Sequence, residues 1–133
     1  MATTEQVEEF LQQFVDWAAN QADIPAVALV GSYVRGQARQ TSDVDLVMIA
    51  ADPARLLQRP AWVERFGRVH QVQIEDYGKV TSVRAWYRDG LEVEFGLTNC
   101  EWVRQPLDPG TRRVIEQGLR VVYEQENILS KLI

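Results

Sequence analysis

The chain has 133 residues, of which 46% are hydrophobic and 25% charged, a composition typical of globular proteins. This length can build one hydrophobic core but is short for two, so we expect a single domain over residues 1–133. The 19 acidic and 14 basic residues give a net charge of −5, which argues against binding to long nucleic acids, because such proteins usually carry a basic surface.

The sequence also argues against export and membrane insertion. No apolar run is long enough to cross a membrane, and the first residues are polar and acidic where a secretory signal would be basic and then apolar. Cys100 is the only cysteine, so an internal disulfide is impossible. We therefore expect a cytoplasmic protein with no membrane partner.

Hydrophobic periodicity divides the chain into helices and strands. Apolar residues spaced three and four apart indicate amphipathic helices, whereas alternation or a short continuous apolar run indicates a strand. Helical segments are predicted over residues 4–20, 32–37, 109–118 and 128–133. Strands are predicted over residues 26–30, 44–50, 68–75, 79–87, 91–97 and 119–123.

Turn residues indicate how the later strands pair. Asp89-Gly90 lies between two strand-like runs, which is a strong hairpin signal, and Asp76-Tyr77-Gly78 separates another such pair. These strands are therefore expected to be antiparallel. We predict an α+β fold, similar to an α/β sandwich, with a mixed, largely antiparallel sheet and helices packed mainly on one face.

One stretch, residues 31–46, combines a glycine-serine turn with two carboxylates. Asp43 and Asp45 are separated by one residue at the start of a predicted strand, so their side chains share a face. Two carboxylates that close repel each other unless a cation lies between them, and Mg2+ binds through carboxylates and substrate phosphates. Gly31 and Ser32 can offer a backbone N–H and a hydroxyl to those phosphates. The stretch indicates a site for a metal and a nucleotide; the alternative is an ordinary turn with a solvated acidic pair.

The same stretch resembles the signature of the DNA polymerase beta-like nucleotidyltransferase superfamily, and most closely its small bacterial branch, the minimal nucleotidyltransferases. The order and spacing of seven residues fit that signature without a gap: Gly31, Ser32, Gly36, Ser42, Asp43, Asp45 and Leu46. The specific match covers about an eighth of the chain and implies a nucleotidyltransferase fold.

The superfamily carries a third carboxylate on a strand beside the Asp-x-Asp strand. In residues 91–95 of this chain, Glu92 and Glu94 alternate with apolar residues. Glu94, between Val93 and Phe95, resembles the third position, and Glu92 is the alternative. Both could instead be solvated residues of an antiparallel sheet. A glutamate here departs from the commoner aspartate.

The resemblance implies Mg2+-dependent transfer of a nucleotide, AMP from ATP, to a hydroxyl group. Asp43, Asp45 and Glu94 would be the catalytic residues and would hold two Mg2+ ions, or Mn2+ in their place. Glu94 could also accept the proton of the hydroxyl. The residues implied to bind the nucleotide are Gly31, Ser32, Gly36, Arg35 and Ser42, the last by orienting Asp43.

The identity of the acceptor remains open at this stage. It could be a small molecule, as in aminoglycoside or lincosamide nucleotidyltransferases, or a protein. One alternative is an antitoxin-like protein that binds a helical RNase toxin and transfers AMP onto it, and another is a nucleotide-binding protein without turnover. Because the chain is short, we expect a homodimer or a helical protein partner to complete the acceptor site.

Overall fold

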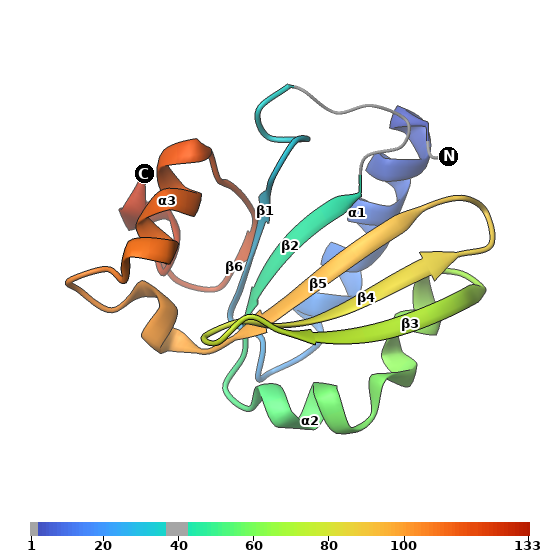
Figure 1. The fold of residues 1–133 in the computed structure, drawn as a ribbon, viewed down its shortest axis with the longest axis horizontal. Coiled ribbons are helices and arrows are strands. Elements are labelled where there is room, and N and C mark those ends of the chain that lie inside the picture. The colour runs from blue at the N-terminus through green and yellow to red at the C-terminus, as the bar shows by residue number, and fades with distance from the viewer. Residues whose placement is uncertain (1–2, 37–42) are drawn as a thin grey trace.

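The computed structural model describes residues 3–36 and 43–133 and folds into one sheet flanked by helices (Figure 1). The helices are α1 (Thr4–Ala19), α2 (Pro53–Gln58) and α3 (Pro109–Gln117), with short 3-10 helices η1 (Pro60–Phe66), η2 (Cys100–Val103) and η3 (Ser130–Leu132). The strands are β1 (Ala26–Val30), β2 (Val44–Ile49), β3 (Val69–Asp76), β4 (Thr81–Tyr87), β5 (Glu92–Thr98) and β6 (Arg120–Glu124).

The strands form one mixed sheet in the order β3-β4-β5-β2-β1-β6. Among the described strands, β2 and β5 are the single parallel pair, and every other neighbouring pair is antiparallel. This confirms the predicted α+β class with a mixed, largely antiparallel sheet. The parallel pair lies at the centre of the sheet and brings together two segments that are far apart in sequence.

One face of the sheet packs against α1, whose start is fixed by a capping box between Thr3 and Gln6. Phe95 of β5 is fully buried there, and its ring centroid lies 5.7 Å from that of Phe14 and 4.8 Å from that of Trp62. Aromatic contacts of this kind anchor β5 to the helical layer. Trp62 packs against this core, where it also stacks on Trp17.

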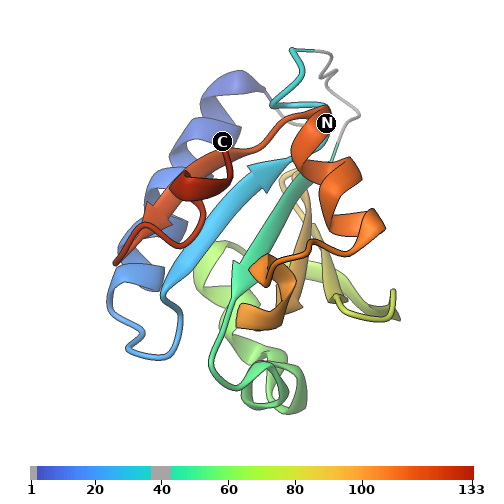
Figure 2. The same ribbon diagram turned by 90° about the vertical axis from the view of Figure 1, so that its left-hand side faces the viewer.

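The opposite face carries α3, η2 and η3 over a second, smaller core. Trp102 and Leu129 are buried in it against Ala28 of β1 and Val47 of β2. Figure 2 shows α1 and α3 on opposite sides of β1 and β2. The longest helix, together with α2 and η1, covers the first face, and the second face is covered mainly beside β1 and β2.

The predicted strands match the observed ones to within two residues, and the differences lie in short helices and one turn. The helices α2, η1 and η2 were not predicted; α2 and η1 are short, and each begins at a proline, which suits a first helical position. The short helix predicted after Gly31 is a hydrogen-bonded turn through Gly36 instead. No helix in the described residues is long and apolar enough to span a membrane.

Candidate active site

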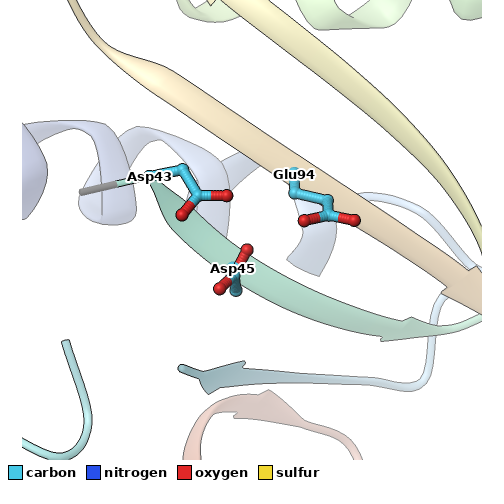
Figure 3. A group of neighbouring side chains, drawn as sticks. All are labelled: Asp43, Asp45 and Glu94. Atoms are coloured by element: carbon cyan, nitrogen blue, oxygen red, sulfur yellow. The ribbon is translucent and has the colours of Figure 1, made fainter. Parts of the chain in front are cut away.

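The site lies where β2 and β5 begin, and strand register positions its side chains. Asp43 directly precedes β2, Asp45 is the second residue of that strand, and Glu94 of β5 is the register partner of Asp45. One carboxylate oxygen from each residue lies within 4.8 Å of those of the other two. Figure 3 shows the three side chains converging from the two strands. The structure thus brings together the three residues that the sequence selected as metal ligands.

Asp45 is the most perturbed member of this group. Burial raises the pKa of its carboxyl from an ordinary 3.8 to about 8, with further contributions from the negative charge and side chain of Asp43 and then of Glu94. Its Oδ1 atom is buried and has no hydrogen-bond partner among the described residues. A buried acceptor without a partner is costly, so this position is suited to a cation.

Gly31 packs directly against Asp45 and requires a conformation that favours glycine. Its φ is +81°, in the left-handed region, and a Cβ at this position would collide with the Asp45 carboxylate. The preceding residue, Val30, is the register partner of Asp45 on β1. The glycine turn and the carboxylate pair are therefore one unit, held by the pairing of β1 with β2.

The other predicted nucleotide-binding residues belong partly to this turn. The backbone N–H groups of Val34 and Arg35 donate to the Gly31 carbonyl at 3.1 and 3.4 Å, which places Ser32 and Arg35 in the turn that begins at Gly31. Gly36 has φ +69°, and a Cβ there would meet nothing within 4 Å among the described residues. Ser42 lies outside the described residues.

The geometry distinguishes the two glutamates of β5. Glu94 lies in the three-carboxylate group, whereas the Glu92 carboxylate accepts a hydrogen bond from Arg84 Nη1 at 2.6 Å and is not part of that group. Glu92 lies two residues before Glu94 on the same face of β5, and its register partner is Trp86 of β4. This arrangement favours Glu94 over Glu92 as the third ligand.

Arg84 is a site residue to which sequence reasoning assigned no role. It lies on β4, opposite Glu94, and its guanidinium contacts Asp43 and Glu94 as well as Glu92. A signal for it was present in the sequence. The hairpin around Asp89-Gly90 pairs residue 87 with residue 91, and counting back from that turn places residue 84 opposite residue 94.

A cavity of about 170 Å³ adjoins the cluster on the face that carries α3. Asp45 and Glu94 line one part of it. Its remaining walls come from several strands, helices and turns and are mostly apolar, with Val30, Val47, Val80, Trp102 and Val114 among them. The carboxylates therefore border a small apolar recess, as is common beside ligand sites.

The pKa of Asp45 predicts how the stability of the metal-free protein depends on pH. Between pH about 4 and about 8 the unfolded state loses the Asp45 proton while the folded state retains it, so rising pH favours unfolding. Asp45→Asn should remove this slope and, at pH 8.5, stabilise the metal-free protein by about 1 to 3 kcal/mol, the usual cost of an unpaired buried group. Denaturant unfolding in EDTA at several pH values measures this. An unchanged slope in the variant would show that Asp45 is not the responsible group.

Comparison with known proteins places this geometry in a family. The family model described as streptomycin adenylyltransferase matches residues 4–115. A comparison with curated proteins found no match. Among solved structures, an aminoglycoside 6-adenyltransferase from Bacillus subtilis is similar, with 21% identity, a TM-score of 0.57, and coverage of 76% of this chain and 37% of that one.

The polymerase core of TRAMP, an RNA surveillance complex, is also similar, with 16% identity, a TM-score of 0.52, and coverage of 72% of this chain and 32% of that one. The chain thus spans about a third of the length of these two structures. These likenesses support the fold, and they agree with the resemblance to the DNA polymerase beta-like superfamily. Because the family model matches most of its length, the chain belongs to the streptomycin adenylyltransferase family and has the nucleotidyltransferase fold.

Proposed function

We propose that the chain transfers AMP from ATP to a hydroxyl group of an acceptor, with Asp43, Asp45 and Glu94 as its catalytic residues. The observation that carries this proposal is the convergence of the three carboxylates around the buried, unpartnered Oδ1 of Asp45. Membership of an adenylyltransferase family supports adenylate as the transferred group.

The donor set fits a hard divalent cation. All three side chains offer oxygen, which Mg2+ and Mn2+ prefer, and the Asp45 oxygen needs a positive partner. We assign Asp43 and Asp45 to an ion on the triphosphate, and the same pair with Glu94 to a second ion. When bound, two such ions neutralise the leaving group and lower the pKa of the attacking hydroxyl.

The remaining chemistry belongs to the residues of the chain. The Gly31 N–H and the Ser32 hydroxyl would bind the β- and γ-phosphates, because their turn lies against Asp45. The acceptor oxygen would form a bond to the α-phosphorus while the bond from that phosphorus to the β-phosphate bridging oxygen breaks, which releases pyrophosphate. Glu94 would accept the hydroxyl proton.

The charge around the cluster supports a cationic acceptor. Glu75 and Glu92 lie beyond Glu94 on the same face, away from the Gly31 turn, and both pair with Arg84, so five carboxyl groups surround one guanidinium between β2 and β3. Such an acidic surface attracts positively charged ligands and disfavours anionic ones. An aminoglycoside, which carries several positive groups, fits this surface, and the family description points to the same class.

Turnover with two matched variants tests the function. Protein with Mg2+ and α-phosphate-labelled ATP should label streptomycin or another aminoglycoside and release pyrophosphate. At saturating Mg2+, Glu94→Gln should lower kcat by about 10²- to 10⁴-fold, as for loss of a general base, and leave ATP binding largely intact. Glu92→Gln should retain turnover under the same conditions.

The outcomes of that assay separate the alternatives. Loss of turnover in Glu92→Gln but not in Glu94→Gln would move the third-carboxylate role to Glu92. ATP binding without transfer to any hydroxyl acceptor would favour a nucleotide-binding protein without turnover. Transfer to a helical protein partner but to no small molecule would favour the antitoxin-like alternative.

We also propose that a second protein surface encloses the acceptor. The cavity beside the carboxylates holds about 170 Å³, which is small for an acceptor and a nucleotide together. The surface could belong to a second copy or to a helical partner. Light scattering with Mg2+ and a non-hydrolysable ATP analogue should then detect a dimer or a stable complex with that partner. A strict monomer that adenylylates a small acceptor at full rate would contradict this.

A further inference from the structure

The Arg84 guanidinium donates hydrogen bonds to four carboxylates. Its Nη1 donates to Asp43 Oδ2 at 3.1 Å and to Glu92 Oε2 at 2.6 Å. Its Nη2 donates to Glu94 Oε2 at 2.9 Å, and its Nε donates to Glu75 Oε1 at 3.0 Å. The side chain is only 18% exposed, so these contacts are largely shielded from water.

The four partners fall into two pairs. Asp43 and Glu94 belong to the group suited to a metal, whereas Glu75 and Glu92 do not. Glu75 is itself oriented, because it also accepts a hydrogen bond from the Tyr77 hydroxyl. The guanidinium is therefore shared between the metal-binding group and two carboxylates outside that group.

Asp45 differs from its two neighbours in this respect. Its Oδ1 has no hydrogen-bond partner among the described residues, whereas one oxygen each of Asp43 and Glu94 is engaged by Arg84. A divalent cation could thus bind Asp45 Oδ1 directly, whereas at Asp43 and Glu94 it would compete with Arg84 for carboxylate oxygens. An arginine remains charged at every physiological pH, so Arg84 cannot make room for the metal ion by losing its proton.

We infer that Arg84 is a displaceable internal cation, which holds Asp43 and Glu94 together until a divalent metal binds and then withdraws onto Glu75 and Glu92. The inference rests on the proposed function, because it requires Asp43 and Glu94 to be metal ligands. Arg84 is a positioning residue on this account: it touches the ligands and not the reacting atoms. Glu75 and Glu92 act through Arg84 by keeping the guanidinium near the site but off the metal.

Removal of the Arg84 charge should change two measured quantities in opposite senses. In EDTA, Arg84→Gln should lower the Tm, because the clustered carboxylates lose their counter-ion. In calorimetry with Mg2+ or Mn2+ and no nucleotide, the same variant should bind the metal about tenfold tighter or more, since a positive charge next to a divalent ion is gone. Arg59→Gln is the matched control, because Arg59 is exposed and follows α2, beyond the far end of β2 (Figure 1).

The two anchoring glutamates provide a test of the withdrawal. Glu92→Gln should weaken metal binding in the wild type, because Arg84 then depends more on Asp43 and Glu94. In the Arg84→Gln background the same change should have a several-fold smaller effect, and the difference is the coupling between the two residues. Glu75→Gln should behave in the same way. A plain loss of negative charge would instead weaken binding equally in both backgrounds.

The possible results separate this inference from the proposed function. If the wild type binds the metal and Arg84→Gln binds it equally well or more weakly, the inference is overturned, but the metal site is not. Equal effects of Glu92→Gln in both backgrounds would overturn the withdrawal onto Glu92. Absence of metal binding in every variant would overturn the metal site itself. If Arg84→Gln does not fold, Arg84→Lys retains the charge without the fork. It should fold and still bind the metal tighter than the wild type, because an ammonium group holds Asp43 and Glu94 with fewer hydrogen bonds.

Discussion

The parallel pairing of β2 with β5 is the constraint on which the site depends. It places Asp45 beside Glu94 at the start of the two central strands, with Asp43 immediately before. Negative charges held this close repel each other, and burial of Asp45 weakens screening by water, so ionisation of this carboxyl is disfavoured below pH about 8 unless a cation is present. The fold therefore maintains an arrangement that is unfavourable without a cation. In the metal-free protein, Arg84 supplies part of that positive charge.

The two faces of the sheet have different tasks. On the α1 face, Phe14, Phe66 and Phe95 pack around each other and hold β5 against the helical layer. That packing stabilises the strands on the α1 face, while the opposite face holds the carboxylates and Arg84 close together. Such a division is common in enzymes, since a preorganised polar site costs stability that a well-packed core must supply. The collision expected for any Cβ at residue 31 shows how closely the glycine turn fits this face.

Much of this arrangement could be predicted from the sequence. Alternation along residues 91–97 and the strand signal after Asp43 located the carboxylates, and both strands form close to their predicted bounds. Their meeting in space was predicted by the resemblance, because local pattern does not specify which distant strands pair. The turn after Gly31 was expected to be helical, but Gly36 adopts a positive φ within that turn.

The rest could not be predicted from pattern alone. The hairpin register places Arg84 opposite Glu94, but its contacts with Glu75 and Asp43 depend on how β3 and β2 pair with that hairpin, which local pattern does not specify. The helix α3 lies on the second face through Val114 and Ile115, which pack against the cluster that contains Trp102 and Leu129, and periodicity alone cannot assign a helix to one face. The short helices α2 and η1 fall below the length at which hydrophobic spacing is informative.

The central claim is that the three carboxylates bind divalent metal ions around the buried oxygen of Asp45. A crystal structure with Mn2+ and a non-hydrolysable ATP analogue, with anomalous diffraction to locate the ions, tests this most directly. The account predicts two Mn2+ peaks, one of them between Asp43 and Asp45 and the other also in contact with Glu94, with the Arg84 guanidinium on Glu75 and Glu92. Bound nucleotide with Mn2+ away from Asp45, or with Arg84 still on Asp43 and Glu94, would contradict it.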